Sequence, residues 1–321
     1  MFFKLYIKNK DNLYIPEIVD EITLKTEKQG SPGTMEFSVI EDELLKIEEG
    51  NLVVLQVDDV DIFWGYIGSI SRTKESVIEI KASDQLKYLK NKDTYVYENK
   101  TASEFIKMIA EDFKINLGEI DDTGFKIKSR VEENTTLFDM ILNALDLTLQ
   151  NKKEMYVLFD DCGKLTLKNI SKMESDVLLD IDTTCDFEFK TSIEDETYNK
   201  IKLTYNNQKT GKRDVYIAQD SNNIDNWGIL QMYETLQDGE NGKAKADALL
   251  ELYNTKKRSL SVTALGDISI RAGSLIPVKL KFKDLEINNF MLVEKCTHKF
   301  NSQQHIMELN LKGGEINNAW C

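Results

Sequence analysis

The sequence contains few residues of the kinds that build catalytic and metal sites. Only 2 of its 321 residues are histidines, and only 3 are prolines. The 4 cysteines form no C-x-x-C pair, which leaves a zinc site or a thioredoxin-type site without support. We therefore expect no metal site and scattered, unpaired thiols at Cys162, Cys185, Cys296 and Cys321.

Long apolar runs and an excess of positive charge are missing as well. No run approaches the ~20 residues that a membrane span needs, and residues 1–12 lack an apolar core of signal-peptide length. Lys and Arg total 41 against 55 Asp and Glu, a net charge of −14. Such a chain binds phosphate backbones and anionic membranes poorly. We expect no specific nucleic-acid binding, no membrane insertion, and synthesis in the bacterial cytoplasm.

Motifs of nucleotide binding and hydrolysis are also absent. The sequence has no P-loop, no G-x-G-x-x-G, no G-x-S-x-G and no H-E-x-x-H. His298 and His305 fall in predicted strands, and the sequence places no nucleophile with an orienting carboxylate beside them, so we expect structural roles for both. We predict no catalytic residue, no cofactor-binding residue and no cofactor, and we do not expect an enzyme.

The remaining candidates are carboxylates and aromatic residues. The acidic clusters fall in predicted turns, where solvated charges are ordinary, although a carboxylate pair for glycoside hydrolysis stays open. Asp180 and Asp182 begin like a calcium loop but lack the glycine and terminal glutamate of an EF-hand. Aromatic residues in strands could form a sugar platform but more often belong to the core. The clusters are Asp58, Asp59 and Asp61, and Glu194, Asp195 and Glu196; the aromatic residues are Trp64, Tyr66, Trp227 and Phe290.

The sequence does contain a pattern of short strands, which is clearest in residues 49–89. Gly50 opens the apolar run Leu52–Val57, and an acidic turn follows. Then come Ile62–Ile67 and, after a polar turn, Val77–Ala82. Three short strands separated by turn residues predict an antiparallel meander or a small barrel.

A similar pattern recurs in residues 272–313. Gly273 opens the run Leu275–Leu280, a polar turn leads to Phe290–Val293, and Ile306–Leu311 closes the unit. The match in pattern and spacing indicates two related barrel units in one chain. The alternative is that any two three-stranded meanders look alike. Two similar units per chain would give a trimer six similar units around a ring.

We predict an α+β fold, mainly β, in three domains. Residues 1–85 form a first β-barrel-like domain, which also includes one helical turn over Glu41–Glu48. Residues 86–175 form a small α+β insert with two amphipathic helices and a hairpin. Residues 176–321 form a second β-barrel-like domain with one helix. The local signals are a capping box at Thr101–Glu104, a second helix start at Asn134–Thr136, hairpins over 156–167 and 201–218, and a helix over Gly242–Lys257.

The order of these segments resembles the XkdQ/YqbQ-type baseplate hub proteins of contractile phage tails and phage-tail-like bacteriocins (tailocins). This family belongs to the late-control-D/VgrG-like class of tail hubs. Each string is ordinary by itself, and their order and spacing carry the resemblance over nearly the whole chain. The strings are SPGTMEF at 31–37, FWGYI at 63–67, DQLKYLKNKDTY at 84–95, ALGD at 264–267 with AGS at 272–274, and FMLVEKCTH at 290–298.

The resemblance implies a structural protein without catalysis. Such hubs are homotrimers whose two barrel-like domains per chain form a ring of pseudo-sixfold symmetry. The ring is a symmetry adaptor, which joins the hexameric tail tube to the trimeric central spike and contacts other baseplate proteins. The chain would then be a virion component of a phage tail or tail-like particle. The alternative is a cell-wall-active glycosidase or glycan-binding protein of the tail tip, and a related contractile injection system is a third possibility.

Overall fold

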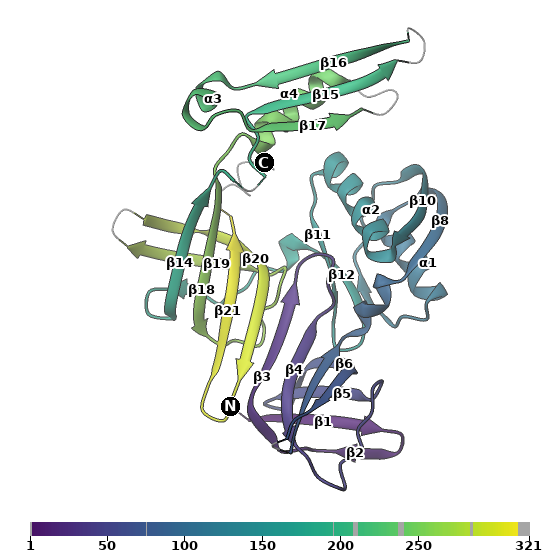
Figure 1. Ribbon diagram of the computed structural model, residues 1–321, viewed down its shortest axis with the longest axis vertical. Helices are drawn as coiled ribbons and strands as arrows, with labels where there is room; N and C mark the ends of the chain where they lie inside the picture. The colour runs from purple at the N-terminus through teal and green to yellow at the C-terminus, as the bar shows by residue number, and fades with distance from the viewer. Residues whose placement is uncertain are drawn as a thin grey trace. The chain divides into compact units, whose positions relative to one another are not determined.

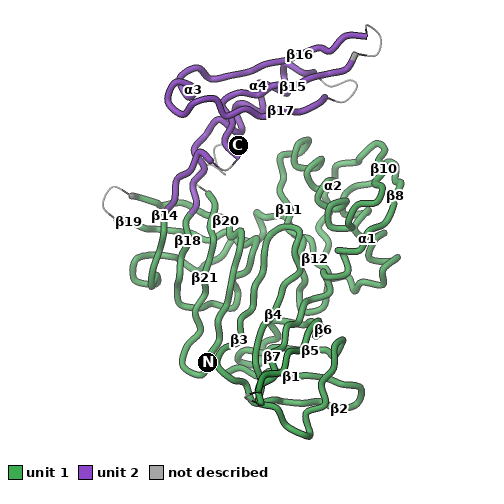
Figure 2. Tube along the Cα trace, viewed as in Figure 1, with its two compact units in different colours: residues 1–188, 260–314 green, residues 189–259, 315–321 purple. Residues whose placement is uncertain are grey.

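The computed structural model describes most of the chain as two compact units (Figure 2). The first unit comprises Met1–Glu188 and Leu260–Gly314, and Phe189–Ser259 belong to the second. The domain boundaries predicted at residues 85 and 175 stay a prediction, because one compact unit can hold more than one domain. The described residues are 2–74, 76–194, 196–207, 211–236, 241–282 and 285–313.

The meander predicted in residues 49–89 is present as three antiparallel strands. They are β5 (Leu52–Val57), β6 (Val60–Arg72) and β7 (Val77–Ser83), paired in that order. Asp58 and Asp59 join the first two strands with positive φ angles of 48° and 65°. Two left-handed residues in succession are typical of the type I′ hairpin turn, which matches the twist of the flanking strands.

The meander predicted in residues 272–313 is present too. Its strands are β19 (Leu275–Phe282), β20 (Leu285–Phe300) and β21 (His305–Lys312), again antiparallel and in chain order. The middle strand is the longest in both meanders, with 13 residues in β6 and 16 in β20. In each meander this strand therefore continues beyond the end of the strand before it.

The likeness between the two meanders extends to five strands. In the first half, β3 (Ile18–Glu27) and β4 (Thr34–Ile40) precede the meander, and the sheet order is β3-β4-β7-β6-β5. In the second half, β14 (Thr184–Ser192) and β18 (Lys257–Leu265) precede it, and the order is β14-β18-β21-β20-β19. When the five strands of each half are numbered along the chain, both sheets have the order first, second, fifth, fourth, third.

One strand pair joins the two halves into a single 13-stranded sheet (Figure 1). β20 pairs antiparallel with β3, from Lys295 opposite Glu27 to Phe300 opposite Ile22. Phe300 has no exposed surface and packs in the core of the first half, although it belongs to the second. The sheet also contains β1 (Phe3–Asn9) and β2 (Asn12–Tyr14) beyond β5, and β13 (Leu179–Asp180) beside β19.

The segment between the halves contains the two predicted helices and the predicted hairpin. The Thr101 hydroxyl accepts a hydrogen bond from Glu104 N, and the Glu104 carboxylate accepts one from Thr101 N, which completes the predicted capping box. The apolar faces of both helices share one core with the hairpin. The elements are η1 (Gln85–Lys90), β8 (Lys92–Lys100), α1 (Ala102–Asp112), β9 (Leu117–Ile120), β10 (Ile127–Thr136), α2 (Leu137–Lys152), β11 (Tyr156–Asp160), β12 (Leu165–Asn169) and η2 (Ile170–Lys172).

The second unit is a small sheet with a helix packed on one face. The central strand pairs antiparallel with one neighbour, as the predicted hairpin requires, and parallel with the other. The helix buries Ile201 and Leu203 beneath Ala246. The elements are β15 (Lys200–Asn207), β16 (Lys212–Gln219), α3 (Ser221–Trp227), β17 (Gln231–Thr235) and α4 (Gly242–Tyr253).

The fold class predicted from the sequence, a mainly β member of the α+β class, is confirmed. The helical turn predicted over Glu41–Glu48 is wrong, since this segment forms a turn and irregular backbone. The Asp42 carboxylate accepts a hydrogen bond from Leu44 N at 2.7 Å, and such local bonds compete with a helix. Across the described ranges, no helix is long and apolar enough to cross a membrane.

Phe300 gives a test of the shared core. The Phe300→Ala variant is expected to lose about 3–5 kcal/mol of unfolding free energy, because it leaves a cavity where the two halves meet. Phe290→Ala, on the same strand but 40% exposed, is the matched control and is expected to lose less than about 1.5 kcal/mol. Denaturant titration of both variants measures the difference. Equal losses would mean that Phe300 does not hold the halves together.

Candidate functional site

The two histidines lie beside each other in the first unit and are both buried. His298 Nδ1 is 2.9 Å from His305 Nε2, and His298 Nε2 is 2.8 Å from the carbonyl oxygen of Ile270. A carbonyl oxygen only accepts hydrogen bonds, so the neutral His298 ring carries its proton on Nε2. His298 Nδ1 then accepts a hydrogen bond from His305 Nε2.

A cysteine completes this group, which sequence reasoning missed. Cys296 Sγ lies 3.2 Å from His298 Nε2, because residues two apart on a strand point to the same face. This resembles a nucleophile with its base, but His298 Nε2 already carries a proton and cannot accept the thiol's. Burial also raises the pKa of the Cys296 thiol to about 12. The three side chains therefore form a structural hydrogen-bonded chain.

Three buried charges meet where the first half, the insert and the second half come together. We call Asp84, Asp160 and Arg271 the charge cluster. Asp84 accepts hydrogen bonds from Gly33 N at 2.7 Å and from Leu86 N at 2.9 Å. Asp84 thereby ties the turn before β4 to the start of the insert.

Arg271 brings the second half to the charge cluster. Its Nη2 donates to the Asp160 carbonyl oxygen at 3.0 Å, and its guanidinium lies 3.8 Å from the centre of the Phe159 ring. Burial raises the pKa of the Asp84 carboxyl to about 8, with repulsion from Asp160 adding to the effect and Arg271 opposing it. Removing the cation would leave two buried carboxyl groups without compensation.

The charge cluster borders a cleft of about 770 Å³ within the first unit. A cleft of this size could accommodate a small ligand. Its polar lining includes Asp61, Asp161 and Asp267, while His298 and Phe300 close its apolar side. Among the described residues, no group of three or more His, Cys, Asp or Glu side chains is arranged to hold a metal ion.

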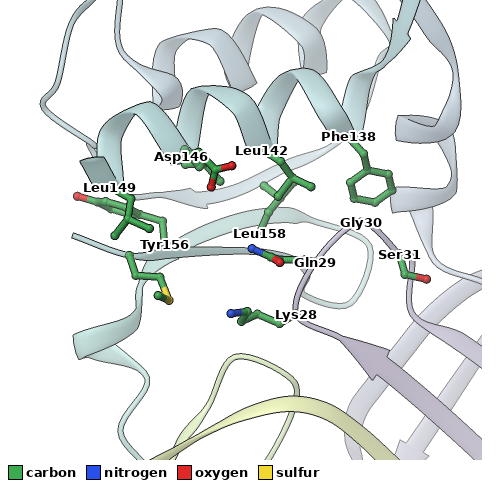
Figure 3. A pocket seen from close by; sticks show the side chains of 12 residues that line it. Lys28, Gln29, Gly30, Ser31, Phe138, Leu142, Asp146, Leu149, Tyr156 and Leu158 are labelled. Carbon is green, nitrogen blue, oxygen red and sulfur yellow. The ribbon is translucent and has the colours of Figure 1, made fainter. Parts of the chain in front are cut away.

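A second cavity lies between the turn at Lys28–Ser31 and helix α2, and it is too small for a substrate. Its volume is about 50 Å³, enough for one or two water molecules. Figure 3 shows Lys28 and Gln29 opposite Asp146 and Leu142. Burial raises the pKa of the Asp146 carboxyl, and the positive charge of Lys28 opposes that shift. Lys28 Nζ also pairs with Glu294 at 2.8 Å, which links the turn to β20.

The first acidic cluster singled out in the sequence has local partners, and so does Asp180. Asp58 accepts from Phe2 N at 2.8 Å, and Asp59 pairs with Lys4 at 2.9 Å. Asp61 accepts from Gln56 Nε2 and from Trp64 Nε1. Asp180 accepts from the backbone of Asp182 and Thr183, and Asp195 lies outside the described residues, between the exposed Glu194 and Glu196.

The aromatic residues considered for a sugar platform make separate local contacts. The Trp64 indole is half-buried and donates to Asp61 at 3.0 Å. The Tyr66 ring lies 6.5 Å from that of Tyr88, with Lys87 Nζ 5.1 Å from its centre. Phe290 is exposed on β20, and Trp227 ends α3 of the second unit.

Comparison with known proteins identifies the family. A YQBQ-like family model matches residues 22–312. The chain belongs to the YQBQ-like family, which confirms the resemblance drawn from the sequence. It is 28% identical over 314 residues to the phage-like element PBSX protein XkdQ of Bacillus subtilis strain 168, covering 94% of each protein.

Solved structures share the fold at low sequence identity. The 43 kDa tail protein of prophage MuSo2 from Shewanella oneidensis superposes with a TM-score of 0.72 at 14% identity, over 98% of this chain and 97% of that one. The Escherichia coli c3393 protein superposes with a TM-score of 0.59 at 9% identity, over 98% and 78%. That protein is described as a type VI secretion component with structural similarity to the T4 tail proteins gp27 and gp5.

The role of Arg271 in the charge cluster predicts that the stability lost on its substitution depends on pH. Arg271→Met is expected to cost about 3–5 kcal/mol at pH 8, because it leaves buried carboxylates unpaired. The loss should be smaller at pH 5, where the Asp84 carboxyl, whose pKa is about 8, is neutral. Denaturant titration at both pH values measures it, with the exposed Arg213→Met as the control. A loss that does not change with pH would contradict this account.

The histidine pair predicts loss of stability in mild acid. Burial, with repulsion from His298, lowers the pKa of His305 to about 4, below that of the unfolded chain. This stability is therefore fully present above about pH 6.5 and is lost as the pH falls towards 4. We expect a loss on the order of 2 kcal/mol, allowing for solvent screening.

The variant His305→Gln isolates this contribution. Its amide can still donate to His298 but does not titrate, so the fall in unfolding free energy between pH 6.5 and pH 4.5 should be smaller than in the wild type. Thermal unfolding across that range measures the slope. An unchanged slope would assign the acid sensitivity to other groups.

Proposed function

We propose that this chain is a structural protein of a phage tail or tail-like particle and serves as its baseplate hub. Three copies form a ring of pseudo-sixfold symmetry. The ring joins the hexameric tail tube to the trimeric central spike, and other baseplate proteins attach around it. The protein is made in the bacterial cytoplasm and becomes part of the particle.

The observation that carries this proposal is the repeated sheet order of the two halves. A sixfold partner can bind a threefold one when each copy of the latter presents two equivalent surfaces. The sheets β3-β4-β7-β6-β5 and β14-β18-β21-β20-β19 supply such a pair within one chain. They are joined side by side by β20 and β3, as neighbours in a ring must be.

The names of similar proteins support the same reading. XkdQ belongs to a phage-like element, the MuSo2 protein is a tail protein, and c3393 is a type VI secretion component. Two of these names refer to a phage-like element or a prophage tail, and the c3393 protein is described as similar in structure to T4 tail proteins. The common features favour a structural role in the particle over a catalytic one.

One observation favours testing the alternative, a cell-wall-active glycosidase or glycan-binding protein. Asp84 borders the larger cleft, and its raised pKa is what a general acid needs. Against this, both Asp84 oxygens accept backbone hydrogen bonds, and the residue is only 5% exposed. If the wild type clears isolated peptidoglycan and Asp84→Asn does not, the alternative would replace the hub.

The hub predicts a defined mass in solution. Light scattering behind a sizing column, across a range of concentrations, should give about three times the 36.9 kDa chain mass. The trimer should then co-assemble with the tube and spike proteins of the same element. A chain that stays monomeric at every concentration and with both partners present would contradict the proposal.

A further inference from the structure

The first half contains a strand segment that corresponds to the part of β20 that pairs with β3. Beyond the end of β19, the last part of β20 from Lys295 to Phe300 pairs with β3 on one side and β21 on the other. The equivalent part of β6 extends beyond the end of β5 in the sheet and leads into the hairpin with β7. Within the described chain, Gly68–Arg72 has a strand neighbour on one side, β7.

The backbone of this segment presents hydrogen-bonding groups to the open side. Ile67 N donates to Asn51 O at 2.9 Å, and Gly50 N donates to Ile67 O, which ends the contact with the β5 side. At the other end, Thr73 N donates to Val77 O. A register shift between Ile67 and Ser69 interrupts the alternation of these directions. Counted back from Thr73 along the antiparallel strand, the N–H and C=O groups of Ile70 and Arg72 face away from β7.

The second half has a matching strand at the end of the sheet. β3 is the first strand of its half and pairs with the β20 of the other half, and β14 holds the equivalent first position. It ends the 13-stranded sheet, with β18 as its sheet neighbour among the described strands. Thr184–Glu188 of β14 belongs to the first unit, and Cys185, Asp186 and Glu188 are exposed there.

We propose that Thr184–Glu188 of one copy pairs antiparallel with Gly68–Arg72 of β6 in a second copy. This contact repeats between chains the pair that β3 and β20 make within one chain. It rests on the proposed ring and names the surface that closes it. Because two different surfaces meet, each copy uses one of each, and such head-to-tail contacts build a ring when the rotation between copies closes.

The chemistry of strand edges fits a second copy in this position. The pair within the chain carries a cross-strand ion pair, Lys295 to Glu27 at 3.0 Å. In the proposed pair, Thr184 lies opposite Arg72, Asp186 opposite Ile70 and Glu188 opposite Gly68. The side chain of Arg72 is 55% exposed and pairs with Glu41 at 3.3 Å. Strand edges left open favour uncontrolled association, and pairing two of them in a fixed register removes both.

Disulfide trapping tests the contact with the full chain. Cys185 supplies one thiol, and Ser69→Cys or Ser71→Cys supplies the other, in a Cys321→Ser background. Ser38→Cys is the matched control, because Ser71, Glu79 and Ser38 lie opposite one another on β6, β7 and β4. The control thiol is about 10 Å further from the edge. Adding Cys185→Ser should abolish any specific product.

We expect mild oxidation to link chains through Cys185 in at least one edge variant, at least about tenfold more than in Ser38→Cys, because a disulfide needs Cβ atoms about 4 Å apart. Cross-linking no greater than the control, in protein that is trimeric by light scattering, would overturn the edge pairing and leave the hub standing. The same result in a protein that stays monomeric with tube and spike present would overturn both.

Discussion

The pairing of β20 with β3 is the constraint on which the rest of the first unit depends. It joins strands separated by more than 250 positions in the sequence and turns two five-strand sheets into one. Closing so long a loop costs entropy, which local hydrogen bonds alone offset poorly. Burial of Phe300 in the core of the first half supplies the apolar contact that makes the pairing favourable.

The contacts within the charge cluster depend on the pairing of β20 with β3. Buried charges are a weak source of stability, since desolvation cancels most of their attraction. They do select one arrangement, because Arg271 has its partners only when the insert and both halves are in register. Asp84 adds a second constraint on the arrangement, because its two hydrogen bonds form only when the turn at Gly33 lies beside η1. Specific assembly of three segments is therefore the role that these charges fit.

Local pattern allowed the sequence to predict the two meanders, both insert helices and the capping box at Thr101. Those features depend on residues a few positions apart, where periodicity and turn chemistry act directly. The pairing of β20 with β3 and the meeting of Asp84 with Arg271 depend on residues far apart, for which one sequence has no signal. Cys296 and His298 are the exception, because their spacing of two on a strand was visible and its consequence was missed.

The two halves differ in the connection between their first and second strands, and this difference bears on the symmetry of the proposed ring. The first and second strands are joined by the short turn Lys28–Gly33 in the first half, whereas the segment containing Phe189–Ser259 joins them in the second. A ring of three such chains would repeat its sheet six times and this segment three times. Surfaces made of sheet then suit a sixfold partner, and surfaces made of the inserted segments suit a threefold one. In the proposed ring, the repeated sheets would supply the sixfold symmetry, and the unequal insertions would supply the threefold one.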